Sequence, residues 1–380
     1  MKIKICCVDE DGRYGGPQSR MIDVYKGIDK KKFDYSFLIP KNVKIFKKKI
    51  ISVKAKFYEA DITRLAKEKI LALKYIFFLP FEIIFLKKFF EEKKFDLIQV
   101  NGIPHFKTIL AAKLSNIKSV WIIEDSYSPK NITLVFRLFV KLLNPNIVYI
   151  SDKVKNFYLK NFDPKKIHCY KIMSPTDTSF FIKKKNKKFN NKKNLNIVSV
   201  SGIIDVKDVE TFLQVAIKII SKNNNVNFIF AGKGTNSEKK YYEKIMSFYD
   251  NLEKKIKKKI KFIGMTSDVK KLLKNTDIFL CTSKSEGGPI TVWEAMSMQL
   301  PVVTTKVGGT TEFIINGYNG FLCKIGNVSE ISKKIEILLK NKILRQNLGL
   351  RARKTAVRHL DYKKISKKYQ KIYESIYKRL

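Results

Sequence analysis

Short apolar runs alternate with helical stretches along the whole chain. In the first half, the runs with the length and composition of buried strands are Ile3–Val8, Tyr35–Ile39, Leu97–Val100, Val120–Ile123 and Ile147–Ile150. A second series follows: Ile197–Ser201, Asn227–Ala231, Lys261–Ile263, Ile278–Cys281 and Val302–Thr304. Because helical stretches separate most of these runs, the pattern predicts an α/β fold in which helices cover both faces of parallel sheets.

A polar and charged segment over 183–194 separates the two series. It has no hydrophobic period, so we interpret it as a linker. A chain of 380 residues has room for two domains with separate cores. We therefore expect one domain over 1–182, a second over 195–345, and C-terminal helices over 346–380.

The most apolar stretch of the chain is 70–90, with the sequence ILALKYIFFLPFEIIFLKKFF. Lys74, Pro80 and Glu82 interrupt it, so it lacks the run of about 18 uncharged apolar residues that is typical of a transmembrane helix. We favour a core or interdomain helix here. Its aromatic residues and its lysine pair keep an in-plane membrane helix as the alternative.

Residues 283–305 contain two acids beside a predicted helix start. The apolar run before this segment predicts a buried strand, and Pro289 suits the first turn of a helix over Ile290–Met298. The loop between strand and helix then lies at the carboxyl edge of a parallel sheet, where open α/β sheets bind ligands. Glu286 lies in this loop and Glu294 lies on the helix.

This pattern predicts a site for an anionic sugar compound. The free N–H groups and the dipole at a helix start favour an anion, whereas a carboxylate binds sugar hydroxyls. Two acids that flank such a helix start suit a sugar–diphosphate–nucleoside, with one acid near each sugar. The alternative is that Glu286 is an exposed loop acid and Glu294 a solvated helix position.

The net charge of +43 is extreme, but lysine accounts for most of it. Only nine of the 77 basic residues are arginine, and the abundance of lysine, asparagine and isoleucine is typical of A/T-rich codon usage. Nucleic-acid readers use arginine for bidentate contacts, so we expect no nucleic-acid partner. A basic surface is attracted to anionic lipid by about 1 kcal/mol per lysine near the membrane, so peripheral association with an anionic membrane surface is the second interpretation.

The cysteines and the N-terminus bear on the compartment. The five cysteines are scattered without a CxxC pair, which indicates neither a disulfide framework nor a zinc site. The N-terminal strand pattern reaches the acidic residues 9–11 too early for a signal peptide. We therefore expect a cytoplasmic protein, with the inner face of the cytoplasmic membrane as a second location.

Several motifs occur together in the order of one enzyme family. Residues 286–294 (EGGPITVWE) resemble the E-x7-E element of retaining, nucleotide-sugar-dependent glycosyltransferases of the GT-B type, family 4. Other segments that match this family in order and spacing are 14–18 (YGGPQ), 230–234 (FAGKG), 300–303 (LPVV), 307–312 (VGGTTE) and 316–322 (NGYNGFL). The resemblance covers the second domain closely and the first domain more loosely.

The resemblance implies a fold and a reaction. The fold would be two Rossmann-like domains that face a cleft, the first on the acceptor side and the second on the donor side, with the C-terminal helices returning to the first domain. The enzyme would be a hexosyltransferase-type glycosyltransferase of cell-surface polysaccharide, lipopolysaccharide or lipid-linked glycan synthesis. Its partners would be a nucleotide diphosphate-sugar, as co-substrate, and a glycan or lipid-linked acceptor that offers a hydroxyl group. It implies no metal and no cofactor.

The resemblance also assigns roles to individual residues. Glu286 would hold the transferred sugar, Glu294 the ribose hydroxyls, and Lys207 the diphosphate. The other expected donor-binding positions lie in glycine-rich loops and at the helix start: Gly15, Gly16, Gly264, Gly287, Gly288, Pro289 and Ile290. The residues agree with a metal-free site, because the sheet-edge loops contain no Asp-x-Asp pair in a setting suitable for a metal. Helix amides and Lys207 would neutralise the diphosphate instead.

Two positions depart from the family pattern. Ile203 stands where the family usually has an arginine, which removes a fixed cation beside the leaving group. Glu124 stands where the family commonly has a histidine that faces the donor sugar, and a carboxylate cannot donate as imidazole does. His105, on a neighbouring loop, is the candidate substitute, so Glu124 and His105 join Glu286 as the predicted catalytic residues.

Three alternatives remain open at this point. The first is a degenerate protein that binds a nucleotide sugar without turnover, and the second is an epimerase or phosphorylase on the same fold. The third is a nucleic-acid-binding protein, which retention on DNA at low ionic strength would reveal.

Overall fold

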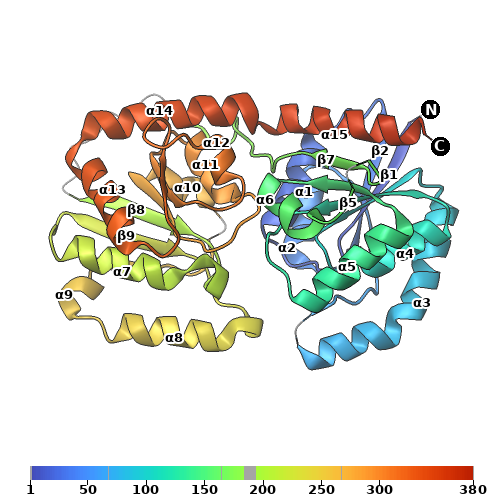
Figure 1. The fold of residues 1–380 in the computed structure, drawn as a ribbon, viewed down its shortest axis with the longest axis horizontal. Helices are drawn as coiled ribbons and strands as arrows, with labels where there is room; N and C mark the ends of the chain where they lie inside the picture. Colours follow the sequence, from blue (N-terminus) through green and yellow to red (C-terminus); the bar gives the residue numbers. More distant parts are fainter. Residues whose placement is uncertain (1, 67, 164, 184–193, 267, 380) are drawn as a thin grey trace. The chain divides into compact units, whose positions relative to one another are not determined.

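The computed structural model describes residues 2–66, 68–163, 165–183, 194–266 and 268–379 (Figure 1). It divides into two compact units. Unit 1 consists of Met1–Pro175 and Tyr362–Leu380, and unit 2 of Thr176–Asp361. The linker predicted over 183–194 lies almost entirely outside the described residues.

The described residues of unit 1 form a seven-stranded parallel sheet with the order β3-β2-β1-β4-β5-β6-β7. Its strands are β1 (Ile3–Val8), β2 (Phe33–Pro40), β3 (Lys56–Ala60), β4 (Leu97–Asn101), β5 (Lys118–Ile123), β6 (Asn146–Tyr149) and β7 (Cys169–Lys171). The strand order reverses between β1 and β4. Their carboxyl ends therefore mark the position where doubly wound sheets bind ligands.

The described residues of unit 2 form a six-stranded parallel sheet with the order β10-β9-β8-β11-β12-β13. Its strands are β8 (Leu195–Val200), β9 (Val226–Ala231), β10 (Ile260–Phe262), β11 (Ile278–Cys281), β12 (Val302–Thr305) and β13 (Phe321–Cys323). The order of unit 1 is repeated, so the reversal here lies between β8 and β11. The two predicted Rossmann-like domains are thus confirmed.

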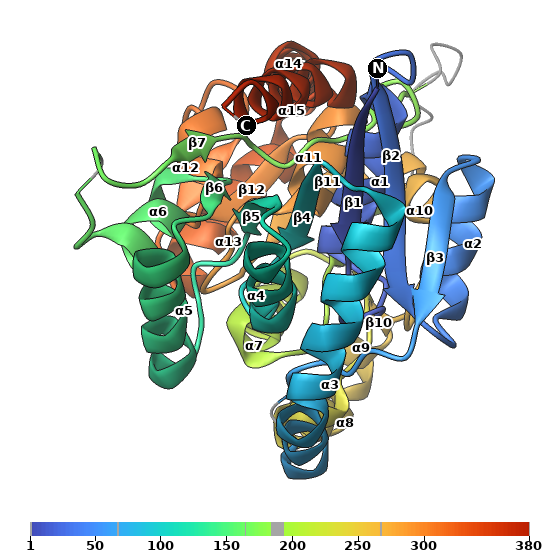
Figure 2. The same cartoon turned by 90° about the vertical axis from the view of Figure 1, so that its right-hand side faces the viewer.

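Helices cover the sheet of unit 1 in two groups. They are α1 (Gly16–Gly27), α2 (Lys44–Ser52), α3 (Lys69–Lys93), α4 (Phe106–Leu114), α5 (Lys130–Leu143), α6 (Asp152–Leu159) and α15 (Tyr362–Tyr377). Helix α1 packs against α2 and α15, whereas α3, α4 and α5 lie side by side (Figure 2). Strands β1, β4 and β5 are therefore largely buried, which explains their nearly continuous apolar sequences.

Unit 2 is built in the same way. Its helices are α7 (Val209–Ile220), α8 (Lys239–Asp250), α9 (Lys254–Lys257), α10 (Val269–Lys274), α11 (Ile290–Ser297), α12 (Thr310–Phe313), α13 (Val328–Lys340) and α14 (Lys342–His359), with 3₁₀ turns η1 (Asp205–Lys207) and η2 (Asn236–Glu238). The helix predicted after Pro289 is confirmed as α11. Phe212 of α7 and Ile335 of α13 are fully buried in the core of this unit.

The C-terminal helical segment is divided between the units. Helix α15 returns to unit 1, where the Ser366 hydroxyl donates to the Val24 carbonyl at 2.9 Å. Helix α14 instead belongs to unit 2, where Arg353 Nη1 donates to the carbonyl of Ser297 at 2.7 Å. The sequence placed the start of the returning segment at 346, but the division between the units lies at Asp361. The difference arises because α14 packs on α11 and α13.

Helix α3 differs from the favoured sequence interpretation. Its inner side is buried, as expected of a core helix, but many large apolar side chains on its outer side are exposed. The prediction that α3 is a core helix is therefore wrong for its outer side, which is exposed. Pro80 lies inside the helix. Among the described residues, no helix combines the length and the apolar character that crossing a bilayer requires.

Candidate functional site

Three loops of unit 2 meet at the carboxyl edge of its sheet, where the strand order reverses. The loop after β11 is joined to the loop after β8, because the Lys284 N–H donates to the Val206 carbonyl at 2.9 Å and the Thr282 hydroxyl donates to the Asp208 carbonyl at 2.9 Å. It is joined to the loop after β12, because the Gly309 N–H donates to the Gly287 carbonyl at 2.9 Å. The predicted donor-binding residues Lys207, Glu286, Gly287 and Gly288 lie in this cluster.

An ion pair occupies the middle of the cluster. Lys207 Nζ lies 2.7 Å from Glu286 Oε1, and the Ser283 hydroxyl donates to the same oxygen at 2.8 Å. The two charged side chains are 22% and 13% exposed, so the pair is partly open to solvent. The alternative that Glu286 is an exposed loop acid is therefore wrong. A partly open lysine can exchange a carboxylate for the oxygens of an anionic ligand.

Helix α11 begins next to the loop that carries Glu286. Its N-cap is Pro289, and no side chain caps the helix. The first N–H groups of a helix have no partner within the helix, and together with the helix dipole they attract an anion. Ile290 opens the helix and Glu294 follows one turn later, buried. The alternative of a solvated Glu294 is thus also wrong.

Gly308 is a residue of this cluster whose role the sequence did not reveal. Its φ is +40°, and a Cβ at this position would lie 2.1 Å from the Glu286 carbonyl oxygen and 2.3 Å from that of Gly287. Only glycine lets the loop after β12 approach the Glu286–Gly287 backbone so closely. The sequence does contain a signal for this close approach, the Gly-Gly pair at 308–309. Its role could be recognised only when the structure showed which backbone atoms lie next to Gly308.

Two further positions that the sequence singled out follow the ends of strands β10 and β8. Gly264 has a φ of +67°, and a Cβ at this position would meet no other atom within 4 Å; its carbonyl accepts from the Gly232 N–H at 2.8 Å. Ile203, which stands at the position of the usual arginine, is buried and pairs with the β9 side through its N–H to the Lys233 carbonyl at 3.0 Å. The side chain at position 203 therefore packs in the core and offers no charge to a ligand.

In unit 1, the predicted catalytic residue Glu124 follows β5 and pairs with Arg20 of α1. Both side chains are buried, at 7% and 1% exposure, and Arg20 also donates to Asn101 Oδ1 at 3.0 Å. Burial raises the pKa of Glu124 to about 7, and the positive charge of Arg20 opposes this rise. Arg20 is a partner that the sequence did not indicate, because it lies 104 residues away on a helix.

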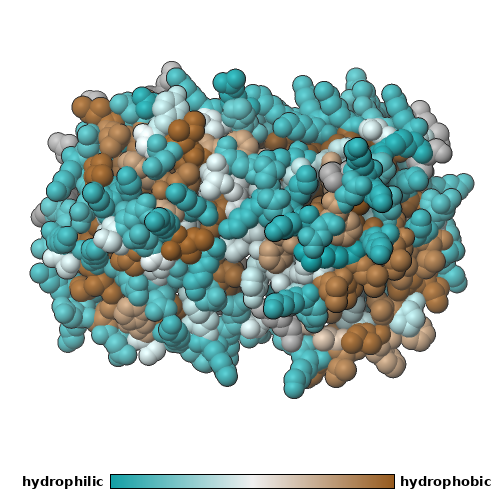
Figure 3. Space-filling view, viewed as in Figure 1, coloured by the Kyte–Doolittle hydropathy of each residue, from teal (hydrophilic) through white to brown (hydrophobic). Residues whose placement is uncertain are grey.

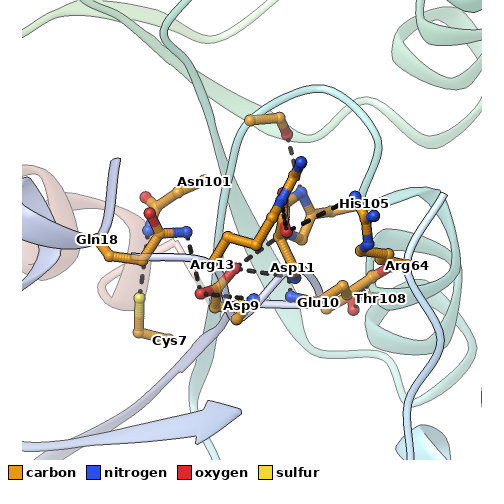
Figure 4. A network of polar contacts seen from close by, with 12 residues as sticks. Cys7, Asp9, Glu10, Asp11, Arg13, Gln18, Arg64, Asn101, His105 and Thr108 are labelled. Atoms are coloured by element: carbon orange, nitrogen blue, oxygen red, sulfur yellow. Dashed lines mark hydrogen bonds and ion pairs between the residues drawn. The ribbon is translucent and has the colours of Figure 1, made fainter. Parts of the chain in front are cut away.

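His105 has both ring nitrogens engaged within unit 1 (Figure 4). Nε2 accepts from the Glu10 N–H at 3.3 Å, and Nδ1 lies 3.2 Å from the Gly102 carbonyl. A carbonyl only accepts, so this arrangement assigns the proton to Nδ1. His105 is buried and holds the end of β1 against the loop after β4. In this conformation it offers neither nitrogen to a sugar.

The glycine-rich loop after β1 is organised by Asp9, which the sequence analysis did not single out. Asp9 accepts from the backbone N–H groups of Asp11 and Gly12 and from Gln18 Nε2, at 3.1, 3.3 and 3.1 Å. Gln18 Oε1 in turn accepts from the Gly15 N–H at 3.1 Å, and Gly15 is the N-cap of α1. Burial raises the pKa of Asp9, and the neighbouring His105 opposes the rise.

Gly16 is the first residue of α1, so the predicted pair Gly15–Gly16 stands at a helix start next to the end of β1. This places them at the edge of the sheet where a ligand of unit 1 would bind. Within unit 1 the structure thus brings together Gly15, Gly16, Glu124 and His105 at one sheet edge. Within unit 2 it brings together Lys207, Glu286, Pro289, Ile290 and Glu294.

Solved structures match both units together. Anabaena HepE, solved in complex with UDP and glucose, aligns with a TM-score of 0.82 over 98% of this chain and 100% of its own, at 17% identity. Sucrose-phosphate synthase from Thermosynechococcus elongatus aligns with a TM-score of 0.79 over 100% of both chains, at 13% identity. At these identities the likeness shows the fold alone. The chain has the GT-B fold.

Sequence comparison agrees for the second GT-B domain. Residues 180–355 match the family Glycosyl transferases group 1. The N-acetyl-alpha-D-glucosaminyl L-malate synthase of Bacillus anthracis is 28% identical over 47% of this chain and 45% of its own. The N,N'-diacetylbacillosaminyl-diphospho-undecaprenol alpha-1,3-N-acetylgalactosaminyltransferase of Campylobacter jejuni is 35% identical over 31% of each chain. The chain thus spans less than half of the length of these relatives.

One further match extends over a larger share of the chain. The UDP-Gal:alpha-D-GlcNAc-diphosphoundecaprenol alpha-1,3-galactosyltransferase of Escherichia coli is 24% identical over 69% of this chain and 71% of its own. Among the described residues, no group of three or more histidine, cysteine, aspartate or glutamate side chains is arranged to hold a metal ion.

Proposed function

We propose that the protein transfers a sugar from a nucleoside diphosphate-sugar to a hydroxyl group of an acceptor, with retained anomeric configuration. The observation that carries this proposal is the Lys207–Glu286 pair at 2.7 Å beside the uncapped start of α11. A cation and free helix amides suit a diphosphate, and carboxylates suit the sugar hydroxyls on either side of it.

Each ligand group then has a protein partner in unit 2. The diphosphate binds to the α11 amides after Gly287 and Gly288 and to Lys207 Nζ. Glu286 is released from the lysine and accepts hydrogen bonds from hydroxyls of the transferred sugar. Glu294, one turn along α11, accepts from the ribose hydroxyls. Gly264, with open space around it, lets the nucleobase approach the backbone.

The reaction needs no covalent intermediate on the protein. The bond between the anomeric carbon and the diphosphate oxygen breaks, and the acceptor oxygen bonds to the same face of that carbon. The acceptor proton passes to the departing phosphate oxygen. Lys207 and the helix amides stabilise the negative charge that develops on this oxygen, which is the electrostatic role that positioned donors play in such sites. The proposal includes no metal.

We propose a lipid-linked or polysaccharide acceptor on the cytoplasmic side of the membrane. The support is that the names of the Campylobacter jejuni and Escherichia coli relatives include a sugar joined to diphospho-undecaprenol. The acceptor would use unit 1, whose sheet edge carries Asp9, Gly15 and Gly16. UDP is the first nucleoside diphosphate to test, because HepE was solved with it.

A second candidate function is binding of a nucleotide sugar without transfer. Two observations favour it: Ile203 packs in the core where a cation is usual, and Glu124 is held by Arg20. The test is to rank UDP, GDP and ADP by thermal shift and then to measure transfer and hydrolysis with sugars on the preferred base. Turnover that Glu286→Gln abolishes supports the enzyme, whereas binding without any turnover supports the second candidate.

A further inference from the structure

Helix α3 exposes an apolar stripe along its outer side. Ile70, Leu73, Phe77, Phe81 and Ile84 are spaced three or four residues apart, so they share one side of the helix. All are largely exposed, with Phe77 at 69% and Phe81 at 64%. The opposite side carries the buried residues Tyr75, Glu82, Leu86 and Phe90, which hold the helix on unit 1.

Helix α5 continues this surface. Leu134, Leu138 and Leu142 are exposed at intervals of four residues, while Phe136 and Val140 are buried beneath them. Because α3 and α5 both pack against α4, the two exposed stripes belong to one side of unit 1. Figure 3 shows hydrophobic side chains gathered over these helices. Apolar patches of this kind on a soluble protein usually mark an interaction site.

The charges around these stripes are almost all positive. Lys69, Lys74 and Lys88 of α3 and Lys130 and Lys141 of α5 are exposed. Neither α4 nor α5 contains an acidic residue, and the exposed acids of α3, Glu91 and Glu92, lie at its C-terminal end, beyond the apolar stripe. Long lysine side chains beside an apolar stripe can reach anionic headgroups while the stripe enters the acyl boundary.

The position of α3 is fixed relative to the edge of the unit 1 sheet. Lys107 of α4 is fully buried, donates to Glu82 of α3 and to the Thr63 carbonyl, and lies 3.5 Å from Glu10, which follows β1. The Thr63 N–H donates to Glu82 at 2.8 Å. This buried network joins the apolar helix to the loop that contains Asp9 and Glu10.

We propose that the outer surface of α3 and α5 docks in the plane of an anionic lipid bilayer. The apolar stripes would lie among the acyl chains close to the headgroups, and the surrounding lysines would contact the phosphates. The bilayer fits better than a protein partner because the charges around the stripes are mostly positive and are spread over both helices. The proposal does not depend on the proposed transfer, so its test contains no turnover.

The test compares two matched double variants by sedimentation with vesicles. Phe77→Ser/Phe81→Ser removes two exposed side chains of the stripe, and Ile343→Ser/Leu350→Ser removes two exposed side chains of α14 in unit 2. With vesicles of equal parts phosphatidylcholine and phosphatidylglycerol, the α3 pair should lower binding by at least about tenfold and the α14 pair should leave it unchanged. Pure phosphatidylcholine should bind the wild-type chain more weakly.

Insertion itself is measured with a reporter. Phe77→Trp should shift its fluorescence to shorter wavelength on these vesicles and be quenched by brominated acyl chains, whereas Ile343→Trp should not. Equal binding of the α3 serine pair and the wild-type chain would overturn the proposal, because charge alone would then explain it. It would also be overturned by a lack of vesicle binding, or by self-association that the α3 serine pair abolishes while vesicle binding persists.

Discussion

Each unit has an ion pair at the carboxyl edge of its sheet, and the two pairs differ in exposure. Arg20 and Glu124 in unit 1 are sealed, at 1% and 7% exposure, whereas Lys207 and Glu286 in unit 2 are 22% and 13% exposed. A buried ion pair holds two elements together, and removing one partner destabilises the protein because the other charge is left buried and unpaired. A partly open pair can exchange partners. The comparison therefore favours a supporting role for the unit 1 pair, and it is consistent with the ligand-binding role that we propose for the unit 2 pair.

The largest effect is expected from breaking the sealed pair. Arg20→Met leaves Glu124 buried without its cation and should lower the free energy of unfolding by about 3–5 kcal/mol. The double variant Arg20→Met/Glu124→Leu should recover most of this loss, because no buried charge remains. Denaturant unfolding measures both. The control is Arg13→Met, which breaks an exposed pair with Asp11 and should cost less than about 1 kcal/mol. A similar small cost for Arg20→Met would contradict a supporting role.

The next effect concerns turnover. Glu286→Gln should lower the transfer rate by about 10²–10³, because it weakens a charged contact to the reacting sugar. Affinity for the nucleoside diphosphate should stay within about threefold, because Lys207 and the α11 amides remain. Glu253→Gln, at an exposed loop position, is the matched control. If rate and affinity fell together, Glu286 would be a binding residue for the nucleotide.

The sealed pair also predicts a pH dependence of stability. Burial raises the pKa of Glu124 from its ordinary value of 4.5 to about 7, so the folded protein binds more protons than the unfolded chain between these values. The contribution of Glu124 to stability should therefore fall as pH rises from about 4.5 to 7, by at most about 1.4 kcal/mol per pH unit, and then stay constant. Glu124→Gln should remove this slope. Parallel curves for the two proteins would show that Glu124 titrates normally.

The smallest effect is expected from the cation of the open pair. Lys207→Met should weaken binding of a nucleoside diphosphate by about tenfold and leave the uncharged nucleoside unaffected, since one charge-assisted contact to the diphosphate is lost. Lys284→Met, beside it but paired with Asp205 at 2.8 Å, should change neither. Equal losses in both variants would indicate a general effect of positive charge.

Much of the fold could be predicted from the sequence because the central strands are buried on both faces. β1, β4, β8 and β11 are short apolar runs, and their alternation with helices specifies parallel sheets. Strand β3 was missed because it combines charged and aromatic residues in a sequence, KFYEA, that is only partly buried at a sheet edge. Strands β7 and β13, with three residues each, were also missed.

The candidate site was predictable where its residues are close in sequence and less so where the fold joins distant ones. Glu286, Pro289 and Glu294 could be placed because they stand on one strand–loop–helix unit. The partner of Glu124 could not, since Arg20 reaches it only through the packing of α1 beside β4 and β5. The engagement of both His105 nitrogens also depends on backbone groups that no side-chain pattern reveals.

The central claim is that the open pair and the start of α11 bind a nucleoside diphosphate. Isothermal titration of UDP, GDP and ADP into the wild-type protein, Lys207→Met and Glu294→Ala tests it most directly. We predict that one of the three binds the wild-type protein and that each variant weakens this binding by about tenfold. Binding that neither substitution changes, or no binding of any of the three, would contradict the account.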